Sequence, residues 1–278
     1  MTLPSSGPLS LQDINNEFGR GANLNAYRGT PYFFPGNINQ YYFPSGTISI
    51  SNFYGTQANN PVTPGSQSFT AAGASTFTVP LFNTMTVQIW GGGGSGGSGY
   101  NGNVSSQGGQ GGSYVSYSIT PGQIVGGGTY NVYVGAGGAT IYTGGGAGNY
   151  GIYSWFAQAI WAIGGYGGLG QFAGTNYAPS YTPTVSVPWT QIASEVGGGG
   201  GYNSAGGSTT YAGGGGGGGR NSAYYNQAGG SSTYGGAGGY GAGPTINAQD
   251  GFQPGGGGGG SVNHSGAGAT GRVTISWT

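Results

Sequence analysis

Glycine fills 71 of the 278 positions, and much of it stands in uninterrupted runs such as residues 213–219 and 255–260. Glycine loses more backbone freedom on folding than any other residue, at a cost of roughly 0.5–1 kcal/mol relative to alanine. Such a chain is either disordered or packed in a way that only glycine permits. Disordered segments usually have few aromatic residues and a high net charge, whereas this chain has 22 Tyr, 11 Phe and 5 Trp and no net charge. We therefore expect an ordered glycine-rich structure.

Charge is nearly absent, and no charged residue stands between Arg28 and Glu195. Nucleic-acid binding needs clustered Lys and Arg, so we expect no nucleic-acid partner. The chain has no Cys, which excludes disulfides and cysteine-based metal sites. No run approaches the ~18 apolar residues of a membrane span, so we expect no membrane insertion. The first residues lack the basic and apolar stretches of a signal peptide, which predicts synthesis in a cytoplasm.

The uninterrupted glycine runs exclude collagen, which needs glycine at every third position, and no apolar heptad supports a coiled coil. The remaining solution is the left-handed helix with three residues per turn and a rise of ~3.1 Å, known as polyglycine II. Without Cβ atoms, such helices approach until the backbone N–H of one meets the C=O of the next, with Cα–H···O contacts in addition. A run of seven residues would span about 22 Å.

Alternating apolar and polar residues predict β-strands on both sides of the glycine-rich body. In residues 85–90 this pattern places Met85, Val87 and Ile89 on one face. The other predicted strands are residues 76–79, 114–119, 130–134 and 272–277. The predicted fold class is thus mainly β and irregular with little α-helix. It comprises a small N-terminal module and a glycine-rich domain of packed polyglycine II helices bracketed by β-strands.

The N-terminal part contains a short repeat, in which residues 6–14 (SGPLSLQDI) align with residues 45–53 (SGTISISNF). Ser10 or Ser49 could cap a short helical turn, with Asp13 at the capping-box position of the first copy. The alternating Leu and Ile residues would instead suit a short strand. We expect a compact module of short turns and strands.

These patterns predict three parts: an N-terminal module over residues 1–57, a linker over 58–66 and a glycine-rich domain over 67–278. Within the last part, polar and aromatic inserts separate the glycine runs, and we expect them to form turns at the ends of a slab. The long insert at residues 171–196 is open to a second interpretation as a separate docking element.

Both halves resemble parts of tailed-bacteriophage proteins. The SGPLSLQDINNEFG and SGTISISNFYG segments resemble a paired motif at the start of many phage virion proteins. The body, from TFTVP through VQIWGGGG to GRVTISW, resembles the glycine-rich domain of phage tail and fibre proteins. Its alternation of glycine motifs and inserts is similar to the receptor-binding adhesins at the tips of T-even-like long tail fibres. The resemblance implies a sandwich of polyglycine helices whose inserts contact the bacterial surface.

No catalytic set is visible in the sequence, so we expect no enzymatic activity, no cofactor and no metal site. His264 is the only histidine, and its Ser-Val-Asn-His-Ser context indicates a polar turn rather than a catalytic base. Asp13 and Glu17 could share a helix face, but Arg20 follows three residues later, which favours a surface ion pair over two-carboxylate hydrolysis.

The inserts combine Tyr with Asn, Ser and Gly, the composition of evolved binding loops. Tyrosines that merely cover the slab edges are the alternative. The predicted receptor contacts are Tyr100, Asn101, Tyr202, Asn203, Tyr224, Tyr225, Asn226, Gln227, Asn247 and Gln249. The predicted virion-attachment residues are Leu9, Leu11, Ile14, Phe18, Ile48, Ile50, Phe53 and Tyr54.

The sequence thus favours a phage virion protein of the tail or fibre tip, made in the host cytoplasm, that binds the host surface. Its expected partners are other tail proteins and a bacterial surface protein or glycan, and a homo-oligomer is left open. The alternative is a structural virion subunit, such as a fibre, baseplate or capsid-decoration protein, with no receptor role. An ice-binding slab is a more distant reading, because it needs a regular Thr array and the threonines here are sparse.

Overall fold

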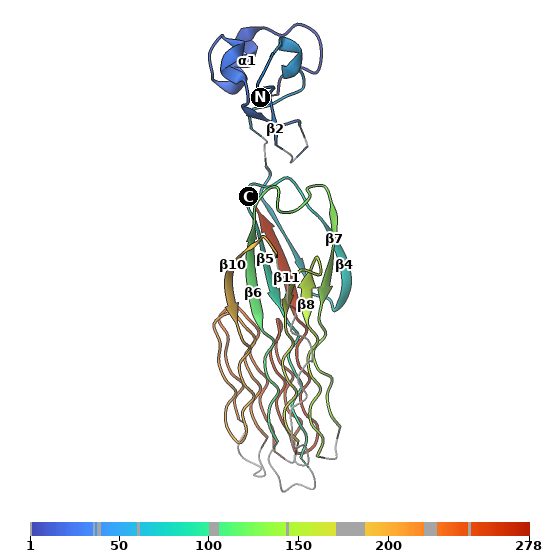
Figure 1. Cartoon of the computed structure of the whole chain (residues 1–278). Helices are drawn as coiled ribbons and strands as arrows, with labels where there is room; N and C mark the ends of the chain where they lie inside the picture. The colour runs from blue at the N-terminus through green and yellow to red at the C-terminus, as the bar shows by residue number, and fades with distance from the viewer. Residues whose placement is uncertain are drawn as a thin grey trace.

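The computed structural model describes residues 2–35, 37, 40–59, 62–99, 106–142, 145–170, 187–219, 227–243 and 246–278. Figure 1 shows an elongated molecule with a small N-terminal unit, a β-sheet region and a bundle of extended segments that continue the strands. The end of the bundle next to the sheets is called proximal below, and the opposite end is called distal.

Two short helices in the N-terminal unit begin at the two copies of the sequence repeat. They are α1 (Leu11–Phe18) and the 3-10 helix η2 (Ile50–Phe53). Ser10 forms a capping box with Asp13, and the N–H of Ser49 donates to Asn52 Oδ1 at 2.8 Å. The capping alternative is confirmed, and the residues proposed as strands there are helical or irregular. The remaining elements are η1 (Leu24–Tyr27), β1 (Pro31–Tyr32) and β2 (Tyr41–Tyr42).

An aromatic core holds this unit together. Tyr27, Phe43 and Phe53 are buried with Ile14, and the rings of Phe43 and Phe53 lie 4.3 Å apart. Phe18 of α1 packs against all three rings. The unit therefore has a hydrophobic core of its own.

The β-region consists of two antiparallel sheets whose residues share one core. The five-stranded sheet has the order β10 (Thr190–Glu195), β6 (Tyr114–Ile119), β5 (Met85–Trp90), β11 (Arg272–Trp277) and β3 (Gly65–Phe69). The four-stranded sheet has the order β4 (Gly73–Thr78), β7 (Thr129–Val134), β8 (Ser154–Phe156) and β9 (Ile160–Ala162).

Alternation places one face of β5, β7 and β11 in this core, as the sequence predicts. Met85, Val87 and Ile89 of β5 are fully buried, as are Val132 of β7 and Phe156 of β8. The predicted fold class is confirmed, because the chain is mainly β with one α-helix among its described residues. The strand β3 begins at Gly65, within the segment that the sequence predicts as a linker.

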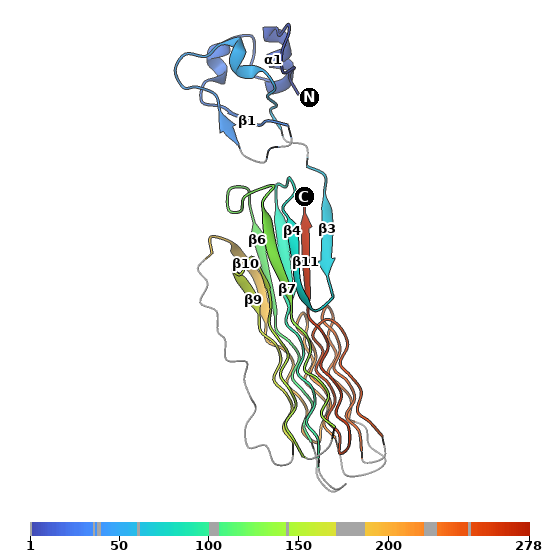
Figure 2. The same cartoon turned by 90° about the vertical axis from the view of Figure 1, so that its right-hand side faces the viewer.

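The glycine-rich segments form a hydrogen-bonded lattice whose pattern repeats every third residue. The N–H groups of Gly91, Gly94 and Gly97 all donate to residues 106–113. The next residues along, Gly92 and Ser95, donate to residues 145–152 instead. This period of three is that of a polyglycine II helix. Figure 2 shows segments from distant parts of the sequence running side by side along the bundle.

Residues 91–99 occupy the centre of this lattice. From residue 91 to residue 98, the N–H groups donate to residues 106–113, 145–152 and 264–271. Their carbonyls accept from residues 135–142, 163–170 and 255–261. The same pattern continues outward through residues 197–201, 204–210, 213–219, 227–232, 235–243 and 246–254. Hydrogen bonds to neighbours on every side thus hold the central segment, as in a hexagonal packing of rods.

Glycine is required because the backbones are in contact. A Cβ atom placed on Gly109 would lie 2.1 Å from the carbonyl oxygen of Gly94, and one on Gly93 would lie 2.1 Å from that of Gly256. Real Cβ atoms essentially never come within 3.0 Å of another heavy atom. Any side chain at these positions would push two hydrogen-bonded segments apart.

Replacement of Gly109 by alanine should therefore destabilise the protein by about 1–3 kcal/mol or more, because the clashing atom belongs to a rigid backbone. Gly199 supplies a matched control, since a Cβ there meets nothing within 4 Å. Gly199→Ala should be neutral or stabilising by about 0.4–1 kcal/mol. Denaturant unfolding of both variants compares the two effects, and equal stabilities would contradict the lattice.

Truncation of Phe53 to alanine should cost the N-terminal unit about 3–5 kcal/mol, because the ring is fully buried among Phe18, Tyr27 and Phe43. Hydrogen exchange should show lost protection in α1 and unchanged protection in β5 and β11. Equal loss of protection in these strands would show that the two cores unfold together and would contradict the predicted division.

Candidate functional site

The distal turns of the bundle carry exposed aromatic residues on a rigid base. Tyr202 follows the segment of residues 197–201, is 55% exposed and pairs with Gln107 in an isolated antiparallel bridge. The next residue, Asn203, has a left-handed backbone with φ of 54°. Its Oδ1 atom is buried and accepts no hydrogen bond from the described part of the chain. This turn thus presents one tyrosine in a fixed position.

The bend of residues 261–264 brings His264 next to Tyr142. Their rings meet edge to face with centroids 5.2 Å apart, and the two residues pair in an antiparallel bridge. Tyr142 is 67% exposed. Ser265 Oγ accepts from the N–H of Ile141 at 2.9 Å and fastens this pair to the bundle. The polar-turn interpretation of His264 agrees with this position, whereas its contact with Tyr142 joins segments far apart in sequence and was not predicted.

The other predicted receptor contacts fall in several places. Gln227 begins an extended segment, where its carbonyl accepts from Gly241 N–H at 2.9 Å. Asn247 is exposed near the distal end. Gln249 lies further along the same segment, and its backbone bonds to Tyr240 and Gly259 place it on the flank rather than in a turn. The predictions at Tyr100, Asn101, Tyr224, Tyr225 and Asn226 lie outside the described residues.

The predicted virion-attachment residues mostly build the core of the N-terminal unit. Ile14, Ile48 and Phe53 are buried in it. Four more pack against it while partly exposed, namely Leu9, Leu11, Phe18 and Ile50. The Tyr54 hydroxyl donates to the carbonyl of Gly7 at 2.6 Å. The exposed aromatic residues of this unit are instead Phe34 and Tyr42, neither of which is among the predicted attachment residues.

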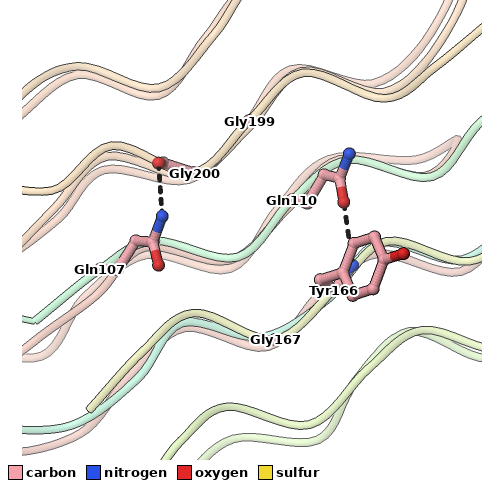
Figure 3. Close-up of a pocket in the computed structure, with 7 residues that line it drawn as sticks. Gln107, Gln110, Tyr166, Gly167, Gly199 and Gly200 are labelled. Carbon is pink, nitrogen blue, oxygen red and sulfur yellow. Dashed lines mark hydrogen bonds between the residues drawn. The ribbon is translucent and has the colours of Figure 1, made fainter. Parts of the chain in front are cut away.

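A polar groove of about 220 Å³ runs along the flank of the bundle over residues 106–113. These residues hydrogen-bond to five neighbouring segments: 91–99, 163–170, 197–201, 213–219 and 255–261. The side between residues 163–170 and 197–201 holds no further segment among the described residues. Figure 3 shows Gln107 and Gln110 projecting into this position, with Tyr166 and Gly167 on one wall and Gly199 and Gly200 on the other.

The two glutamine amides bridge the walls of the groove. Gln107 Nε2 donates to Gly200 O at 3.1 Å, and its Oε1 accepts from Leu169 N at 3.2 Å. Gln110 repeats this arrangement three residues later, between Gly197 O and Tyr166 N. Each amide therefore makes the contacts that a peptide group of an additional segment would make. The backbone groups that line the groove at these points already have hydrogen-bond partners in the two glutamine side chains. This indicates a structural role for Gln107 and Gln110.

Carboxylates of the described residues are engaged with backbone N–H groups. Asp13 accepts from Ser10, whose side chain and backbone hydrogen bonds lower the pKa of the carboxyl. Partial burial alone would raise the pKa of Glu195. Bonds from the N–H groups of Thr210, Ala212 and Tyr211 together outweigh this effect and hold the pKa below its ordinary value. Asp13 therefore caps α1, and Glu195 holds the turn at residues 210–212 in place.

Within the described ranges, no three His, Asp or Glu side chains gather closely enough to hold a metal ion. Nor does any helix in those ranges have the length and apolar character that a membrane crossing requires.

Comparison with known proteins places the body of the chain in a family. No curated protein matches the sequence. The family model described as a glycine-rich domain matches residues 70–278, which comprise the two-sheet core except β3 and all of the polyglycine bundle. On this match, which covers most of its length, the chain belongs to the glycine-rich domain family.

Proposed function

We propose that this protein is a phage virion protein of the tail or fibre tip and that it binds the host cell surface through the distal turns of its bundle. The observation that supports this proposal is the exposed Tyr202 and Tyr142, held at the distal end by turns whose flanking segments are fixed in the lattice. Its partners would be other tail proteins and a bacterial surface protein or glycan.

The lattice suits this role because it holds the turns in place before binding, so that less conformational entropy is lost when they bind. Ordering a flexible side chain at an interface costs about 0.5–1.5 kcal/mol. Here both ends of a turn leave from segments that are hydrogen-bonded along their length, as residues 197–201 are to residues 106–113 and 213–219. Tyrosine adds contact area with little flexibility of its own. Turn residues can also change without disturbing the glycine contacts beneath them.

The N-terminal unit would attach the protein to the particle. Its core is closed by its own residues, so attachment would use its surface, where Phe34 is 37% and Tyr42 is 64% exposed. The protein would be made, and the particle assembled, in the host cytoplasm. The bundle projects from the sheets on the side opposite this unit (Figure 1), which would leave the distal turns free to contact a cell.

The test is competition for adsorption with the purified full-length chain. Added to cells that the parent phage infects, the chain should block adsorption in a dose-dependent way. A variant with Tyr142→Ala and Tyr202→Ala should need roughly tenfold more protein for the same block, since central aromatic residues dominate interface energies. A second variant with Tyr224→Ala and Tyr225→Ala tests the predicted contacts outside the described residues.

The matched control replaces two tyrosines on the flank, Tyr150 and Tyr240, which are similarly exposed at 46% and 51%. This control should block adsorption as the unmodified chain does. The proposal fails if the chain binds no cells even when it is displayed in many copies on a bead, which restores multivalency. A structural virion subunit would then be the better assignment.

A further inference from the structure

Two turns at the proximal end of the bundle have nearly the same sequence. Residues 208–211 are Ser-Thr-Thr-Tyr, and residues 231–234 are Ser-Ser-Thr-Tyr. The carbonyl of Tyr211 accepts from the indole N–H of Trp90 at 2.7 Å, which places the first turn beside the end of β5. We call these eight residues the tyrosine ledge.

Backbone hydrogen bonds fix the two turns of the ledge side by side. Thr209 N donates to Ser231 O, and Tyr234 N donates to Thr210 O, both at 2.9 Å. Ser231 N also donates to Ser208 Oγ at 3.0 Å. Equivalent residues of the two turns therefore lie next to one another.

The Glu195 carboxylate holds the first turn in place through hydrogen bonds to its backbone. It accepts the N–H groups of Thr210, Tyr211 and Ala212, three successive residues. The charge of Glu195 is thus committed to the backbone of the ledge. The other described charge at this place is Arg272, whose guanidinium lies 5.9 Å from the ring of Trp90.

The tyrosine rings form a stack that leads from the core to solvent. Tyr114 and Tyr211 stack at 5.2 Å with an interplanar angle of 15°, and Tyr211 and Tyr234 stack at 5.0 Å and 11°. Exposure rises along the stack from 2% for Tyr114 to 39% for Tyr211 and 59% for Tyr234. No further ring of the described residues stacks on Tyr234. The Tyr234 ring is therefore the outermost ring of the stack, and its outer face is open to a ligand.

The two turns that carry this open ring also carry four exposed hydroxyl groups, of which Ser231 Oγ donates to Ser208 Oγ at 3.2 Å. Ser208, Thr210, Ser231 and Thr233 are exposed, and each carries a hydroxyl that can both donate and accept. A ligand that matches the ledge needs a flat apolar face for Tyr234 and hydroxyls at its rim. It needs no charge, because the Glu195 carboxylate already accepts three backbone N–H groups and the Arg272 guanidinium lies over the Trp90 ring.

We propose that the tyrosine ledge is a binding site for a neutral pyranose sugar. One face of a pyranose ring presents C–H groups that stack on an aromatic ring, and its rim carries hydroxyls that suit the Ser and Thr side chains of the ledge. A charged sugar would lose hydration without gaining an ionic partner. The site lies on the proximal flank and is separate from the distal turns, so it does not depend on the proposed receptor contacts.

The test is saturation-transfer NMR on the full-length chain with three probes: methyl α-D-mannopyranoside, methyl β-D-glucopyranoside and methyl β-D-galactopyranoside. At least one should receive saturation, with its ring C–H protons most strongly affected. Tyr234→Ala should weaken binding by roughly five- to tenfold, in line with the energy of an aromatic stacking contact. Tyr234→Phe is the matched control and should retain affinity within about twofold, because the ring remains.

A thermal unfolding curve first establishes that both variants keep the wild-type fold, as the exposure of Tyr234 leads us to expect. Absence of saturation transfer to all three sugars would overturn the proposal, as would equal binding by Tyr234→Ala and the unmodified chain. The Tyr150→Ala and Tyr240→Ala variant, which changes two exposed tyrosines outside both proposed sites, should bind the sugars normally. Loss of sugar binding in that variant would show that the sugars contact exposed tyrosines in general and would also overturn the ledge assignment.

Discussion

The glycine-rich bundle depends on one interaction, the hydrogen bond between backbones that approach closely enough to exclude a Cβ atom. At Gly109 and Gly93, the space that a methyl group would need is taken by a carbonyl oxygen of the neighbouring segment. The resulting contacts provide the cohesion that buried side chains provide in an ordinary core. Apolar packing is concentrated instead in the sheets and the N-terminal unit. The glycine content is high because backbone contacts, rather than side-chain packing, hold the bundle together.

The period of three divides the positions of each segment into those that face neighbours and those that face outward. In the segment of residues 163–170, Tyr166 and Leu169 are three residues apart and both partly exposed, while the intervening glycines are buried. The chain can therefore carry ordinary side chains at one position in three along its surface. The turns at both ends of the bundle can also carry ordinary side chains, and the exposed tyrosines lie there and along the flanks.

The sequence predicted those features that depend on side chains, such as the alternation of Val87 and Ile89 in β5 and the capping box of Ser10 and Asp13. It missed β10, an edge strand whose Ile192 is 58% exposed and which has no apolar face to reveal it. It could not assign lattice neighbours, because runs of identical glycines carry no information on register. The three-residue spacing of Gln107 and Gln110, by contrast, indicates the period of the lattice in the sequence itself. At the candidate site, composition found Tyr202, whereas the pairing of Tyr142 with His264 depends on long-range topology.

A lattice of this kind has no natural boundary, since every outer segment offers further N–H and C=O groups to another glycine-rich strand. Exposed edges of β-sheets pose the same hazard of uncontrolled association. Here Gln107 and Gln110 place their amides where the next segment would lie and bond to both neighbouring walls. Ser113 continues the series three residues later by bonding to both backbone groups of Ile163. Side chains at every third position thus end the lattice on this side, and the same geometry that demands glycine inside the bundle determines where other residues must interrupt it.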